Sequence, residues 1–92
     1  MAELIHEIWH DQESHSFEMS VVSKQTDEQR QRMNPKAVKV YTFVAQSDYE
    51  AAQKNYDWHG WGQYDPEPGW PDRFFTDEEA EEQRRYMTTR TV

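Results

Sequence analysis

Three short stretches of the chain have hydrophobic patterns that we interpret as β-strands. In residues 14–22 every second side chain is apolar, as in a strand with one buried face. Residues 37–45 carry β-branched and aromatic side chains at both parities, which predicts a central strand covered on both faces. Residues 4–10 fit either a helix or a strand. We interpret them as a strand because sequential strands usually pair.

Three helices are predicted by one signal, a capping box at their first residues. The boxes are Thr26–Gln29, Ser47–Glu50 and Thr76–Glu79. The second helix covers residues 48–59, and Gly60 is suited to end it. Four of its residues share one face at helical spacing, which we expect to face the core. They are Tyr49, Ala52, Gln53 and Tyr56.

In the order β-β-α-β-α-loop-α, these elements predict an α+β fold, a small antiparallel sheet of about three strands with helices packed on one face. A chain of 92 residues forms one domain, residues 1–92. We expect its compact part to span about residues 3–75, and the acidic helix 77–89 to dock loosely because it has few apolar residues. The predicted core consists of Phe17, Met19, Val21, Val38, Val40, Tyr41, Phe43, Ala52 and Tyr56.

The charge of the chain excludes some partners. The net charge is −8, and residues 65–82 hold eight acids against Arg73 alone. Such a chain repels a phosphate backbone, so we expect no nucleic-acid binding, and a basic protein is the favoured partner. There is no cysteine, no basic and apolar leader and no long apolar run. We therefore expect a soluble, cytoplasmic protein that does not enter a membrane.

One short motif matches the sequence pattern of a catalytic site. Residues His6, Glu7 and His10 match the zinc-peptidase pattern H-E-x-x-H, which needs both histidines on one helical face and a third ligand. On a strand the two histidines would stand roughly 13 Å apart, too far for one metal ion. We predict no catalytic, cofactor-binding or metal-binding residue. A small metal-binding domain or enzyme centred on these residues is the alternative.

Residues 60–75 combine glycines and prolines, which prevent regular structure, with five aromatic rings. Rings on such a segment either cover the core as a lid or contact a partner. A small ligand bound beneath the segment, as in a regulatory domain, is a further alternative. The candidate protein-contact residues are Trp58, His59, Trp61, Tyr64 and Trp70.

One part of the chain resembles a family of small uncharacterised bacterial proteins. This part consists of residues 41–45, 47–51, Tyr56 and 60–66. That family has a strand, a capped helix and a G-W-G-x-Y-x-P ending, and the resemblance covers about a third of the chain. It implies no activity, cofactor or catalytic residue. From the acidic charge and the aromatic segment, the function expected is a non-enzymatic protein-binding module, such as a small acidic inhibitor, an immunity-type protein or an accessory protein.

Overall fold

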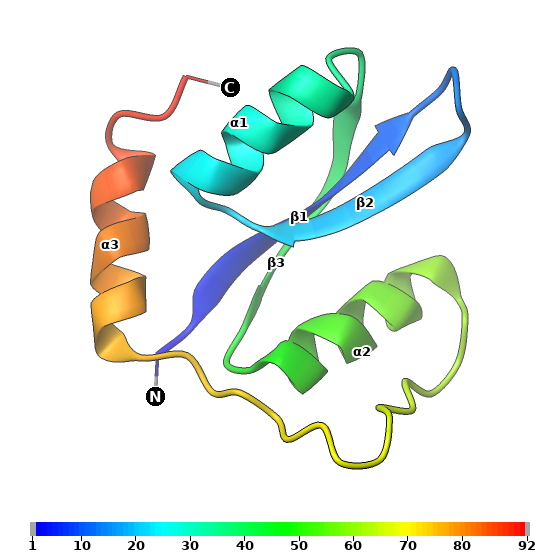
Figure 1. Ribbon diagram of the computed structural model, residues 1–92, viewed down its shortest axis with the longest axis vertical. Coiled ribbons are helices and arrows are strands. Elements are labelled where there is room, and N and C mark those ends of the chain that lie inside the picture. Colours follow the sequence, from blue (N-terminus) through cyan, green and yellow to red (C-terminus); the bar gives the residue numbers. More distant parts are fainter. Residues whose placement is uncertain (1, 92) are drawn as a thin grey trace.

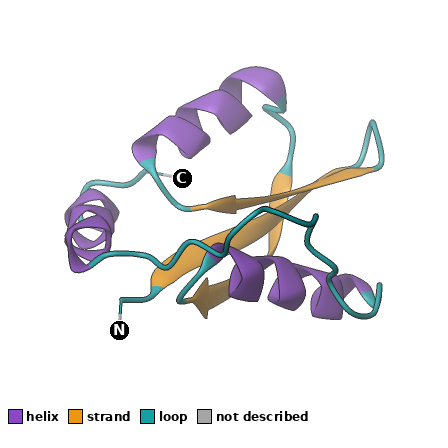
Figure 2. Cartoon of the chain, turned by 60° about the horizontal axis from the view of Figure 1, so that its bottom comes forward, coloured by secondary structure: helices purple, strands orange, loops and turns teal. Residues whose placement is uncertain are grey.

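The computed structural model describes residues 2–91. Its elements are β1 (Leu4–Asp11), β2 (Ser16–Val21), α1 (Lys24–Met33), β3 (Val38–Ala45), α2 (Asp48–His59) and α3 (Asp77–Met87). The strands form one antiparallel sheet in the order β2-β1-β3 (Figure 1). The predicted α+β class and element order are confirmed. The helices, expected on one face, cover both, because α1 and α2 lie on opposite sides of the sheet (Figure 2).

The central strand is β1, and the prediction that residues 37–45 form the central strand is wrong. β3 lies at an edge of the sheet, and most of its side chains are exposed. The apolar pattern misled because β1 carries His6 and Glu7 at buried positions. Polar side chains can be buried when each one has a hydrogen-bond partner, and these partners come from distant parts of the chain.

The two faces of β1 differ in chemistry. On one face, Leu4 and Ile8 pack with residues of β3, α2 and the last loop to form the apolar core. On the other face, Glu7 and Trp9 meet charged residues of α1 and of the segment after α3. The core cluster consists of Ala2, Leu4, Ile8, Phe43, Ala45, Ala51 and Phe75.

Most of the predicted core is not fully buried. Among the predicted residues only Phe43 is buried, while Phe17, Val38, Val40 and Tyr41 are exposed. The other four are partly buried: Met19, Val21, Ala52 and Tyr56.

The predicted inner stripe of α2 faces the following loop instead of the sheet. The Gln53 side chain bonds to the backbone of Gly62 and Tyr64, and the Tyr56 ring contacts the ring of Trp61. The sheet side of the helix is formed instead by Ala51, which lies in the core, and by Trp58, which stacks on a ring of β3.

The helix ends follow local capping signals, with one shift. α1 begins after Ser23, whose hydroxyl accepts the Thr26 N–H, so the predicted box at Thr26–Gln29 is wrong by one turn. α2 and α3 start at the predicted N-caps, Ser47 and Thr76. Gly60 ends α2 with φ 73°, a left-handed conformation that glycine adopts without strain.

α3 is attached to the sheet mainly by one amide side chain. Gln83 accepts the Ile5 N–H at 2.8 Å and donates to the carbonyls of Ile5 and Val22 at 3.0 and 2.9 Å. Gln83 therefore provides hydrogen-bond partners for the backbone N–H and C=O groups at the end of the β1–β2 ladder. Ala80 of the same helix also packs against the apolar core.

Candidate functional site

Five rings gather where the last turn of α2 crosses the hairpin end of the sheet. This aromatic patch consists of Phe17, Tyr41, Trp58, His59 and Trp61. Four of the rings reach the surface, with exposed fractions of 46% for Phe17, 42% for Tyr41, 37% for Trp58 and 57% for Trp61. Exposed rings that also touch one another are characteristic of contact surfaces, because each ring keeps its neighbours in place.

The ring contacts within the patch are close. Trp58 stacks on Tyr41 with centroids 5.9 Å apart and meets the edge of Phe17 at 5.7 Å. His59 also contacts Phe17, at 4.9 Å, and lies flat on Trp61 at 3.9 Å. Desolvation by these surroundings lowers the pKa of His59, which favours its neutral form at pH 7.

Secondary structure holds each ring in position. Phe17 lies on β2, directly opposite His10 in the register of the sheet, and the two rings stack at 4.3 Å. Trp58 and His59 are the last two residues of α2, and the left-handed turn at Gly60 brings Trp61 back onto His59. Tyr41 lies on β3, so the patch is built on two strands and a helix end, with only one ring on a loop.

Three of the five predicted contact residues lie together in the patch, and two do not. Tyr64 contacts Tyr56 and Tyr49, at 5.3 and 6.0 Å, on the loop side of α2. Trp70 is 68% exposed and its carbonyl accepts a hydrogen bond from the Tyr49 hydroxyl. Trp70 is thus a separate exposed ring on the loop.

Sequence reasoning missed Phe17 and Tyr41 as surface residues, since both were assigned to the core. Both lie on the face of the sheet that α2 covers, because Phe17 pairs in register with His10 and Tyr41 with Ile8. The helix covers that face only in part, and the two rings protrude beside its end. The signal that could have found them is the sheet order, which local patterns do not reveal.

The role of core lid falls to Phe75. Its ring is 7% exposed and packs on His6 with centroids 5.6 Å apart. The neighbouring backbone pairs with the end of β3, since Phe75 N–H donates to Gln46 at 3.0 Å and Asp48 N–H donates to Arg73 at 3.0 Å. Residues 73–75 close the core, whereas Trp61 and Trp70 do not.

The His6, Glu7 and His10 side chains do not converge. Both histidines point to the α2 face, where His6 stacks on Phe43 and His10 on Phe17. Glu7 points to the α1 face and binds Arg90. In residues 2–91 no three His, Cys, Asp or Glu side chains are grouped as a metal site. The geometry therefore gives no support to the zinc-peptidase arrangement.

The α1 face holds a buried ionic network. Arg90 donates to both oxygens of Glu7, at 2.6 and 2.7 Å, and to Asp27, at 2.8 and 3.0 Å. Arg30 pairs with Asp27 at 2.9 Å, and its guanidinium lies 3.6 Å from the centre of the Trp9 ring. Burial alone would raise the pKa of Glu7 and Asp27. The hydrogen bonds and positive charge of Arg90 act together with the other hydrogen bonds to each carboxylate, and their combined effect lowers both pKa values.

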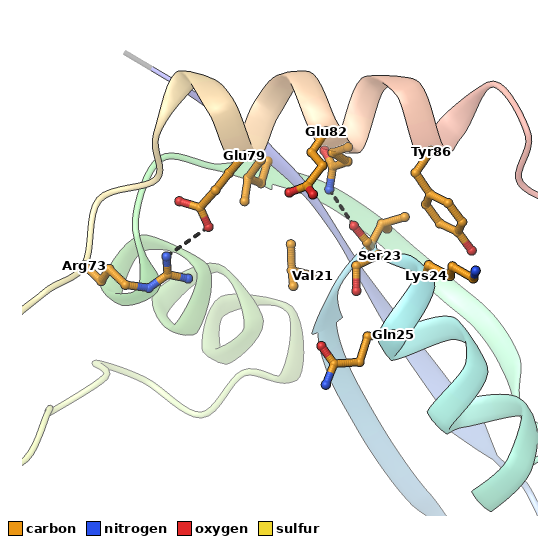
Figure 3. A pocket seen from close by; sticks show the side chains of 11 residues that line it. Val21, Ser23, Lys24, Gln25, Arg73, Glu79, Glu82 and Tyr86 are labelled. Atoms are coloured by element: carbon orange, nitrogen blue, oxygen red, sulfur yellow. Dashed lines mark hydrogen bonds and ion pairs between the residues drawn. The ribbon is translucent and has the colours of Figure 1, made fainter.

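A cleft of about 340 Å³ opens between α3 and the first turn of α1. The Arg73–Glu79 ion pair, 3.0 Å long, lies at one end and Tyr86 at the other (Figure 3). None of the predicted contact residues lines it, so it is not the ligand site expected beneath the aromatic loop.

Comparison of the chain with protein-family models, curated proteins and solved structures found no match. The resemblance to small bacterial proteins therefore stays a prediction. Among residues 2–91, no helix has the length and apolar character needed to cross a membrane.

Proposed function

We propose that this chain is a non-enzymatic protein-binding module, of the inhibitor, immunity-protein or accessory-protein kind. The aromatic patch is its contact surface. The observation that carries the proposal is that four exposed rings, those of Phe17, Tyr41, Trp58 and Trp61, are linked into one group. Tryptophan and tyrosine are enriched among residues that dominate binding energy, because they bury a large area at a low entropic cost.

The charge of the chain supports a basic partner. The net charge is −8, and such a field accelerates the encounter with a positively charged protein. Steering of this kind weakens as salt is added, because the ions screen the exposed charges. In this proposal the rings supply the buried anchor and the acidic residues raise the association rate.

The metal or enzyme alternative is less well supported, because Glu7 is separated from the two histidines by the sheet and is engaged with Arg90. The small-ligand alternative would need a cavity under the aromatic loop. The cleft of about 340 Å³ lies elsewhere, between α3 and α1, and its Arg73 and Glu79 side chains already form an ion pair.

Capture of proteins from an extract of the native host by immobilised variants tests the proposal. The Trp61→Ala chain should lose the partner that the unchanged chain retains. Phe74→Ala is the matched control, because Phe74 is an aromatic residue with a similar exposed fraction, 55% against 57%, outside the patch. Equal capture by Trp61→Ala and the unchanged chain, with both variants folded, would rule out the patch as the contact surface.

A further inference from the structure

The outer edge of β2 has backbone groups without a partner. The Val22 N–H donates to Ile5 at 2.9 Å, and its carbonyl binds Gln83, so the Val22 backbone points towards β1. Backbone direction alternates along a strand, which turns the N–H and C=O groups of Phe17 and Met19 away from the sheet. No strand of residues 2–91 pairs with this side of β2, since it is the end of the sheet.

The opposite edge, along β3, is protected in three ways. The Lys54 ammonium donates to the outward Val44 carbonyl at 2.6 Å. The register with β1 shifts around Val40, as at a β-bulge, and Ser47 just beyond the strand pairs with Phe74. Lysines, bulges and covering segments are the usual devices that prevent edge pairing. Among the outward backbone groups of β2, only the Val21 carbonyl has a partner within residues 2–91, the Thr26 hydroxyl at 2.7 Å.

β2 also carries an unsatisfied acid between its two open residues. Glu18 is the only charged residue of Ser16–Val21, and its Oε2 is buried and has no hydrogen-bond partner in the described chain. Glu18 pairs in register with Trp9, so its side chain lies on the α1 face. An incoming strand would place one side chain directly opposite it, at the closer, non-hydrogen-bonded type of pair.

We infer that the outer edge of β2 receives an extended basic segment of the partner as a fourth strand. A Lys or Arg of that segment stands opposite Glu18, and apolar side chains on either side of it pack beside Phe17 and Met19. Charge complementarity selects this occupant, because a second copy of this chain would set Glu18 against Glu18 or a neutral residue. Phe17 belongs to the aromatic patch, so the added strand and the patch form one continuous surface. The inference rests on the proposed function and specifies how the partner is held.

A peptide of about seven alternating valine and lysine residues is a suitable probe, since a typical strand has this length. Hydrogen exchange of single amides, followed by NMR, should show slower exchange at Phe17 and Met19 when the peptide is added. The outward amide of Val44 serves as the internal control. Protection of Val44 instead, or no protection at about 1 mM peptide, overturns the inference.

Proline substitutions test the backbone pairing. In Met19→Pro the outward N–H is lost while the ladder to β1 is kept, so peptide affinity should fall by roughly tenfold. Thr42→Pro is the matched control. The Thr42 backbone N–H faces outward on the protected β3 edge, so the loss of this N–H should leave the peptide affinity unchanged. A peptide N-methylated on its edge-facing nitrogens makes the same test on the unchanged chain if Met19→Pro does not fold. Undiminished binding of that peptide contradicts strand addition.

The charge preference has its own test. The lysine peptide should bind more tightly than the same peptide with glutamate in place of lysine, and Glu18→Gln should reduce that preference. Equal binding of both peptides to the unchanged chain overturns the basic occupant.

Capture of the native partner separates the two proposals. Capture lost in Trp61→Ala but kept in Met19→Pro overturns strand addition and leaves the proposed function standing. Loss in both variants supports both. Loss in Met19→Pro alone supports strand addition and contradicts the patch, and full capture by both overturns the two together.

Discussion

The guanidinium of Arg90 donates to both carboxylate oxygens of Glu7, joining the last described turn of the chain to the middle of the central strand. Both side chains are almost fully buried, with exposed fractions of 7% and 3%. Two carboxylates, Glu7 and Asp27, share this one cation. Ion pairs therefore stabilise the α1 face of the sheet, whereas apolar packing stabilises the α2 face.

Replacing Arg90 with methionine should lower the free energy of unfolding by about 3–5 kcal/mol, because it leaves two buried carboxylates short of a counter-charge. Urea unfolding followed by circular dichroism measures the change. Arg84→Met is the control, since the Arg84 side chain is 66% exposed and its pair with Glu81 should contribute less than about 1 kcal/mol. A similar small loss in both variants would contradict a stabilising network.

The free energy of unfolding should fall as the pH decreases below 6.5, the ordinary pKa of a histidine such as His6. Burial lowers the pKa of His6 in the folded protein, although the Leu4 carbonyl partly opposes it, so the unfolded chain binds a proton at a higher pH than the folded one. The stabilisation that neutral His6 contributes is complete above pH 6.5, and it is lost as the pH falls towards the pKa of His6 in the folded protein. His6→Phe removes this dependence. Unfolding curves of the two chains between about pH 7 and 5 should diverge, and parallel curves would count against a buried neutral His6.

Two adjacent phenylalanines should differ sharply in their contribution to stability. Phe75→Ala should reduce the free energy of unfolding by about 3–5 kcal/mol, because its buried ring closes the core over His6. Phe74→Ala removes an exposed ring and should cost less than about 1 kcal/mol. Chemical denaturation of both variants measures the difference. Equal losses would mean that residues 73–75 are not the lid.

Trp70→Ala should leave the melting temperature within about 2 °C of the unchanged protein, since the ring is exposed and makes no ring contact with the patch. Differential scanning calorimetry measures this temperature. A decrease of about 5 °C or more would place Trp70 in the core. Weaker capture of the partner by the same variant would extend the contact surface from the patch to the loop.

The order of elements could be predicted because each one has a local cause. Ser47 and Thr76 cap the helices that follow them, and Gly60 ends α2 with a left-handed turn. The identity of the central strand could not be predicted, because the burial of Glu7 depends on Arg90, which lies 83 residues away. No pattern within residues 4–10 contains that information.

The candidate site was predicted in part for the same reason. Trp58, His59 and Trp61 are neighbours along a helix end, so their proximity follows from the chain itself. Phe17 and Tyr41 join them only because β2 and β3 flank β1 and α2 leaves that end of the sheet partly uncovered. Trp70 was grouped with the others on composition, and the course of the loop separates it from them.

The unequal protection of the two sheet edges limits how far the sheet can grow. A sheet with two free edges can add neighbours indefinitely, which is how stacked fibres extend. Here Lys54, the irregularity at Val40 and the Ser47–Phe74 bridge hinder pairing along β3, and the β2 side is the edge that we propose accepts a strand. Pairing along the edge should therefore stop after a single addition, so that a complex with the partner would contain a four-stranded sheet and would not extend into a continuous ribbon.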